Sequence, residues 1–154
     1  MHDSRCLEIL VRLRDFFRKY GVKYRILYAI VYGSLVNCRL TGLSDIDICV
    51  KISSSTGKTD RLEIIAELAN DIEEHIGIKA DVIDIELVEL PLKYTVFKEG
   101  IPVYIYSRDS FVKDKWLYTL LWLDYVDAYN RMHNRVVEKI MVGKRETWNK
   151  KKNR

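Results

Sequence analysis

The fold is decided by one stretch, residues 28–50, which reads YAIVYGSLVNCRLTGLSDIDICV. It joins the end of one apolar run, Tyr24 to Tyr32, to a second apolar run, Asp45 to Lys51, that contains two acids. Continuous apolar segments of this length, bounded by turn residues, are typical of buried strands. We therefore predict two buried strands, connected by the turn and loop that begin at Gly33.

The two acids in the second run, Asp45 and Asp47, are the candidate catalytic and metal-binding residues. Side chains at positions i and i+2 of a strand share one face, so the two carboxylates are expected side by side. Such a pair repels itself and loses hydration in apolar surroundings, and a bound divalent cation removes that penalty. Oxygen ligands that leave room for water and phosphate favour Mg²⁺, with Mn²⁺ as a substitute. The structural alternative is that both acids lie on a solvated strand end.

The turn between the two strands opens with Gly33 and Ser34, the candidate nucleotide-binding residues. Glycine lets the backbone approach a phosphate closely, and the N–H groups of such a turn can bind phosphate oxygens together with the serine hydroxyl. The sequence lacks the Gly-Lys-Ser/Thr signature of a Walker loop. Phosphates would therefore be held by the turn and a metal ion together.

A third carboxylate is expected from a further strand, predicted over Ala80 to Leu87. This segment offers Asp81 and Asp84, which are an odd number of residues apart and so face opposite sides of a sheet. Only one of them can join Asp45 and Asp47, and the pattern alone does not choose between them.

The other elements follow from helical spacing and from glycine and proline. We expect helices at 4–20, at 60–76 with Asp60-x-x-Glu63 as a capping box, from Pro91 to before Gly100, and from about 109 to 142, and a strand at 101–106. This order predicts one α/β domain over residues 1–142. A basic tail, residues 143–154, is expected to be disordered.

Charge and hydropathy exclude several classes of protein. The net charge of +4 belongs to the tail, since residues 1–142 carry slightly more acid than base, so direct nucleic-acid binding is not expected. The apolar runs are too short to cross a bilayer, and the start shows no signal-peptide pattern. The three cysteines form no CxxC pair, which indicates free thiols and a cytoplasmic location.

The motif Gly33-Ser34, followed after ten residues by Asp45-x-Asp47, resembles the hallmark of the minimal nucleotidyltransferase (MNT) proteins of the polymerase-β-like superfamily. The closest resemblance is to the antitoxins of HEPN–MNT toxin–antitoxin pairs, and it covers residues from about 5 to 135. Further matching segments are Asp81-Val82-Ile83, which aligns with the strand of the third acid, Lys98-Glu99-Gly100 and Ser107-Arg108-Asp109. The resemblance implies a polymerase-β-like fold, with a mixed sheet of about four strands flanked by helices and a long C-terminal helix.

The resemblance also implies an activity, because such antitoxins use ATP and Mg²⁺ to transfer AMP onto a tyrosine of a partner HEPN ribonuclease toxin, which neutralises it. The residues that would hold two Mg²⁺ ions and the nucleotide are Asp45, Asp47, Asp81, Gly33 and Ser34. In one respect the chain departs from the family, which often has Arg-Gly where this sequence has Asn37-Cys38. Two alternatives stay open: a catalytically decayed antitoxin that neutralises its partner by binding only, and a small-molecule nucleotidyltransferase.

The last predicted helix is apolar almost all round between Trp116 and Val126. Helices of this kind are usually buried. One part is expected to pack on the sheet, and the other could bind the HEPN partner or a second copy of the chain as a homo-oligomer.

Overall fold

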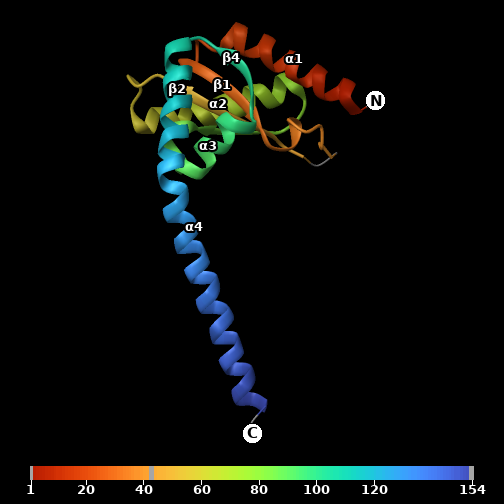
Figure 1. Cartoon of the computed structure of the whole chain (residues 1–154). Coiled ribbons are helices and arrows are strands. Elements are labelled where there is room, and N and C mark those ends of the chain that lie inside the picture. The colour runs from red at the N-terminus through yellow and green to blue at the C-terminus, as the bar shows by residue number, and fades with distance from the viewer. Residues whose placement is uncertain (1, 42–43, 153–154) are drawn as a thin grey trace. The chain divides into compact units, whose positions relative to one another are not determined.

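The computed structural model of the chain describes residues 2–41 and 44–152, with side chains for residues 4–41 and 44–142. The elements (Figure 1) are α1 (His2–Tyr20), β1 (Ile26–Tyr32), the 3₁₀ turn η1 (Gly33–Leu35), β2 (Ile46–Ile52), α2 (Lys58–Ile76), β3 (Ala80–Asp84), η2 (Ile85–Leu87), α3 (Leu90–Glu99), β4 (Ile101–Ile105) and α4 (Arg108–Lys152). This order confirms the predicted alternation. The chain divides into two compact units, Met1–Tyr118 with the whole sheet and Thr119–Arg154.

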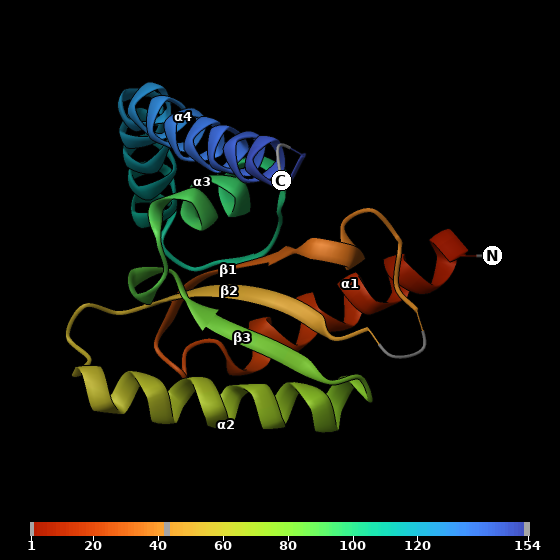
Figure 2. The same cartoon turned by 90° about the horizontal axis from the view of Figure 1, so that it is seen from below.

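The four strands form one mixed sheet in the order β3-β2-β1-β4. β1 pairs antiparallel with both β2 and β4, whereas β2 pairs parallel with β3. Figure 2 shows α1 and α2 on one side of the sheet and α3 on the other. Within the described ranges, none of the helices has the length and hydrophobicity that a bilayer crossing needs.

The alternation of side chains along β2 decides which face the acids occupy. Ile46, Ile48 and Val50 are fully buried in the core that α1 and α2 cover. Cys49 is buried in the second core, together with residues of α3 and the first turns of α4. Since alternate residues of a strand share a face, Asp47 lies on the same side of the sheet as Cys49, at the N-terminal end of β2.

A buried ion pair fixes α2 against β3. Arg61 Nη1 lies 2.6 Å from Asp84 Oδ2, and Arg61 Nε donates to the carbonyl oxygen of Thr56 at 3.1 Å. Asp84 is 1% exposed, and its other carboxylate oxygen accepts from the N–H of Glu86. Both carboxylate oxygens of Asp84 are therefore occupied by contacts within the fold. Removing Arg61 would leave the buried charge of Asp84 without a partner.

A second polar cluster attaches the first turns of α4 to the sheet. Lys51 on β2 contacts both Glu86 and Asp114, with 3.1 Å between its Nζ and Asp114 Oδ2. The Tyr28 hydroxyl donates to the same carboxylate at 2.8 Å, and burial raises the pKa of Tyr28. These contacts join Asp114 in the first turns of α4 to β1 and β2 within the first unit.

Three predicted boundaries are wrong for local reasons. α2 begins at Lys58, after Gly57, and its N-cap makes no side-chain hydrogen bond, so Asp60 lies inside the first turn and forms no capping box. β3 ends at Asp84 and not at residue 87, because the Asp84 side chain closes the turn η2. α4 continues beyond 142 to Lys152. The side chains of residues 143–154 lie outside the described part, and the disordered tail stays a prediction.

Candidate functional site

Strand register brings two of the predicted acids together. Asp47 on β2 is paired with Asp81 on β3 and, on its other side, with Tyr32 at the end of β1. Paired residues of adjacent strands lie on the same face, about 5 Å apart. Asp84 lies on the opposite face with Arg61. The sequence pattern left Asp81 and Asp84 as alternatives for the third carboxylate. In the structure Asp81 is the one that lies beside Asp47.

Negative charge is concentrated at this point of the sheet. Burial raises the pKa of Asp47, and the carboxylates of Asp81 and then Asp45 raise it further. Burial and the nearby Asp47 carboxylate also raise the pKa of Tyr32. A site that resists ionisation for these reasons gains stability from a bound cation.

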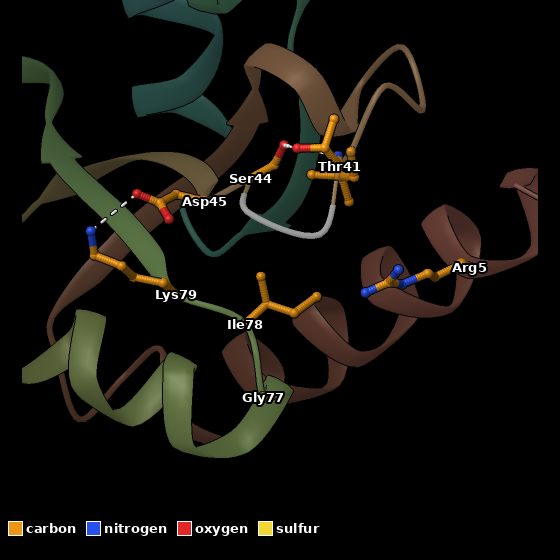
Figure 3. Close-up of a pocket in the computed structure, with 8 residues that line it drawn as sticks. Arg5, Thr41, Ser44, Asp45, Gly77, Ile78 and Lys79 are labelled. Carbon is orange, nitrogen blue, oxygen red and sulfur yellow. Dashed lines mark hydrogen bonds and ion pairs between the residues drawn. The ribbon is translucent and has the colours of Figure 1, made fainter.

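Asp45, the third acid, directly precedes β2 and is only partly exposed. Figure 3 shows its carboxylate directed toward Lys79, whose Nζ lies 3.2 Å from Asp45 Oδ2. The two chain segments are joined by the hydrogen bond from the Ile46 N–H to the Lys79 carbonyl oxygen at 2.8 Å. Because the Lys79 side chain is 68% exposed, this ion pair is weak and can open when another cation competes for the carboxylate.

Gly33 lies directly against Asp47. Its φ of 71° is in the left-handed region, which residues other than glycine adopt only at a cost in conformational energy. A Cβ placed on Gly33 would overlap Asp47 Oδ2 and would lie 3.1 Å from Asp47 Cγ. Both the backbone conformation and the close approach therefore require glycine at the end of β1.

The turn after Gly33 borders a hollow of about 270 Å³. Its lining residues are Tyr32, Gly33, Ser34, Val36, Asn37, Arg39, Thr95 and Glu99. Arg39 is held in the turn by the hydrogen bond from its N–H to the Ser34 carbonyl oxygen at 2.9 Å. The sequence analysis missed Arg39 as a candidate phosphate-binding residue, although a single basic side chain in a turn after Gly-Ser was a usable signal.

At the departure Asn37-Cys38, the cysteine lies in a backbone conformation that favours glycine. Cys38 has a φ of 50°, a left-handed conformation that glycine adopts without strain. For a cysteine this conformation costs about 1 kcal/mol of conformational energy. The turn thus has a shape suited to glycine at Cys38, while Asn37 supplies a neutral side chain to the hollow.

A second hollow, also about 270 Å³, lies at Asp45 (Figure 3). Arg5 from α1, Thr41 and Ser44 from the loop, and Lys79 contribute its polar lining. The Ser44 hydroxyl accepts a hydrogen bond from the Thr41 N–H at 2.9 Å and lies 2.9 Å from the Thr41 hydroxyl. One hollow therefore lies beside Gly33, which contacts Asp47, and the other includes Asp45.

The residue types at this site fit a divalent cation. The site supplies oxygen ligands only, from Asp45, Asp47 and Asp81. Repulsion from Asp81 and Asp45 raises the pKa of Asp47, and a bound cation would remove this electrostatic penalty on the charged carboxylates. No group of three His, Cys, Asp or Glu side chains is assembled closely enough to hold a metal ion in the part of the chain that the structure describes. Asp45 instead contacts Lys79.

Solved structures share this fold at low sequence identity. A structure from Shewanella oneidensis is 18% identical with a TM-score of 0.55, covering 86% of this chain and 96% of that chain. A mutant of the toxin-antitoxin MntA-HpeT is 16% identical with a TM-score of 0.54, covering 77% and 97%. A toxin-antitoxin structure with AMP-PNP is 18% identical with a TM-score of 0.52, covering 74% and 96%. No curated protein sequence matches the chain.

A family assignment comes from the sequence itself. The family model described as "Polymerase beta, Nucleotidyltransferase" matches residues 12–110, which is more than half of the chain. The matched range contains the turn at Gly33, the acids Asp45, Asp47 and Asp81, and all four strands. The chain therefore belongs to the polymerase beta nucleotidyltransferase family.

Proposed function

We propose that this chain is a cytoplasmic antitoxin that transfers AMP from ATP onto a tyrosine of a partner HEPN ribonuclease toxin and so neutralises it. The observation that carries the proposal is the pairing of Asp47 with Asp81 directly beside Gly33, in a chain of the nucleotidyltransferase family. Likeness to toxin-antitoxin structures, one of them with the ATP analogue AMP-PNP, supports the choice of nucleotide and partner.

In this proposal Asp45, Asp47 and Asp81 hold Mg²⁺, two ions by analogy with related transfer enzymes, and Mn²⁺ substitutes. When bound, Mg²⁺ neutralises the triphosphate and the leaving pyrophosphate. Asp45 becomes available as a ligand once its exposed ion pair with Lys79 opens.

The nucleotide is bound by the turn at the end of β1. The backbone of Gly33, which has no side chain to block the approach, and the hydroxyl of Ser34 bind phosphate oxygens. Arg39 adds a positive charge on the same hollow. These groups place the α-phosphorus next to the acids of β2 and β3.

The chemical step is a substitution at that phosphorus. The acceptor hydroxyl oxygen forms a bond to the α-phosphorus, the bond from the α-phosphorus to the bridging oxygen breaks, and pyrophosphate leaves. Asp81, which is exposed at the edge of the sheet, accepts the proton of the hydroxyl. Positioning and charge neutralisation supply most of the rate, as in other phosphoryl transfers.

The test uses ATP labelled at either the α- or the γ-phosphate, with a HEPN protein encoded beside this chain as acceptor. The α-label is expected on the HEPN protein and the γ-label in pyrophosphate. Asp47→Asn and Asp81→Asn should reduce transfer to background, because a neutral amide is a poor Mg²⁺ ligand. Asp15→Asn, the same change on the exposed surface of α1, is the matched control. Undiminished transfer by both site variants would refute the assignment.

A second candidate is an antitoxin that neutralises its partner by binding alone. The presence of Asn37-Cys38 in place of the family's frequent Arg-Gly favours it. In that case the wild-type chain would protect RNA from the HEPN ribonuclease without ATP, and no label would move.

A further inference from the structure

The second unit of the chain carries an exposed apolar stripe along α4. Its members are Leu121, Tyr125, Tyr129, Met132, Val136 and Ile140, and they recur at the spacing of a single helix face. Their exposed fractions run from 37% for Tyr129 to 61% for Met132. A contiguous apolar surface of this kind marks a contact with another molecule.

The opposite face of the same helix segment is mixed, because exposed apolar residues, Leu120, Leu123, Met141 and Val142, lie there among polar ones. The polar members, again at helical spacing, are Asp124, Asp127, Arg131, Asn134 and Glu138. All of them are exposed. Apolar side chains thus form an unbroken series on the stripe, whereas charged and amide side chains interrupt them on the opposite face.

The spacing of the stripe suits a second copy of the chain laid antiparallel. Steps of four, four, three, four and four residues separate its six members, and this series is the same in both directions. A second copy laid antiparallel therefore places Leu121 against Ile140, Tyr125 against Val136, and Tyr129 against Met132. Each contact occurs twice, as a two-fold interface requires.

Charge along one flank of the stripe supports the antiparallel direction. Asp124 lies near the beginning of the segment, and Arg135 and Lys139 lie near its end on the same flank. Antiparallel copies bring Asp124 of each chain between Arg135 and Lys139 of the other. Parallel copies would instead bring the flank of Asp124 against the opposite flank of the partner, which carries no Lys or Arg between residues 119 and 142, so Asp124 would lack a cationic partner.

Aromatic side chains strengthen the proposed contact. The rings of Tyr125 and Tyr129 lie 5.9 Å apart, and both are adjacent to the ring of Trp122. Large aromatic groups are enriched at the centres of protein interfaces. We infer that the chain forms an antiparallel homodimer through the stripe on α4, independently of its activity as a transferase.

Light scattering on the full chain after size exclusion tests the inference. The wild type is expected at about twice its monomer mass of 18.2 kDa. Tyr129→Glu at the middle of the stripe should give a monomer, whereas Asn134→Glu on the opposite face should leave the dimer intact. Circular dichroism checks that both variants keep their helix. A monomeric wild type, or a dimer that survives Tyr129→Glu, overturns the inference.

A charge exchange tests the pairing of the flanks. Asp124→Lys alone and the double variant Arg135→Glu, Lys139→Glu alone should each dimerise at least about tenfold more weakly than the wild type, because like charges then meet twice. An equal mixture of the two should recover the wild-type affinity as a heterodimer. A mixture no stronger than either variant alone contradicts the proposed pairing.

Crosslinking fixes the direction. Under mild oxidation, a mixture of Leu121→Cys and Ile140→Cys chains should form a disulfide between the two variants, and either variant alone should form far less. Both variants carry Cys38→Ser, because Cys38 is only partly buried, and the Cys38→Ser chain, which keeps the buried Cys6 and Cys49, is the control. Faster crosslinking of Leu121→Cys with itself would show a parallel pair and refute the antiparallel arrangement.

Discussion

Replacing Gly33 by alanine tests the contact between the turn and the acid at its most constrained point. The substitution forces an L-residue into a φ of 71° and places a methyl group onto Asp47 Oδ2. Gly77, at the end of α2, provides the matched control, because its φ is 80° but nothing lies within 4 Å of an added Cβ. Gly77→Ala therefore carries the backbone cost alone.

The expected magnitudes differ for these two sites. The left-handed conformation costs an alanine about 1–2 kcal/mol at either position. At Gly33, Asp47 must also leave its preferred rotamer to make room, which adds roughly 1 kcal/mol. At about 2–4 °C per kcal/mol for a chain of this size, we expect Tm to fall by roughly 3–6 °C for Gly77→Ala and 5–10 °C for Gly33→Ala.

A double-mutant cycle read by calorimetry separates the two contributions. An Asp47→Ala background removes the two closest atoms, Asp47 Oδ2 and Cγ, and leaves the Cβ at 3.5 Å from the added methyl group. The cost of Gly33→Ala should then fall to that of Gly77→Ala. If Gly33→Ala is no more destabilising than Gly77→Ala, or if Asp47→Ala leaves its cost unchanged, the proposed contact does not exist.

Three further predictions concern single side chains. Arg61→Ala should lower the free energy of unfolding in urea by about 3–5 kcal/mol, because it strands the buried Asp84 carboxylate; an effect below 1 kcal/mol contradicts the pair. Asp47→Asn should raise Tm at pH 7, since a pKa that folding raises means that the charged form opposes folding, and the gain should shrink as the pH falls through the raised pKa of Asp47 and vanish below its ordinary value of 3.8. Arg39→Gln should weaken ATP binding by about tenfold in calorimetry while Tm stays within 2 °C, and unchanged binding would remove Arg39 from the nucleotide site.

The sequence sufficed for the order of elements and for the buried strands, because continuous apolar runs and glycine stops are local signals. The residue pattern alone could not distinguish Asp81 from Asp84, and only the family resemblance favoured Asp81. That choice depends on strand register and on Arg61, which reaches β3 from α2 and is distant in the chain. Pairing across a sheet is a tertiary property that periodicity does not encode.

Side chains near the acids were harder to predict for the same reason. Lys79 contacts Asp45 because the two segments meet at the start of adjacent strands, and Arg39 reaches the hollow because the turn folds back on Ser34. Neither contact has a spacing signature. The catalytic and metal-binding roles of Asp45, Asp47 and Asp81 stay predictions that only measurement can decide.

The most direct measurement is a calorimetric titration of ATP in the presence of Mg²⁺ into four proteins: wild type, Asp47→Asn, Asp81→Asn and the surface control Asp15→Asn. The account predicts that the control binds like the wild type and that each of the two site variants binds at least about tenfold more weakly. Removing Mg²⁺ with a chelator should weaken the wild type to the same level. Equal affinity in all four proteins would contradict the claim that the acids of β2 and β3 form the nucleotide site.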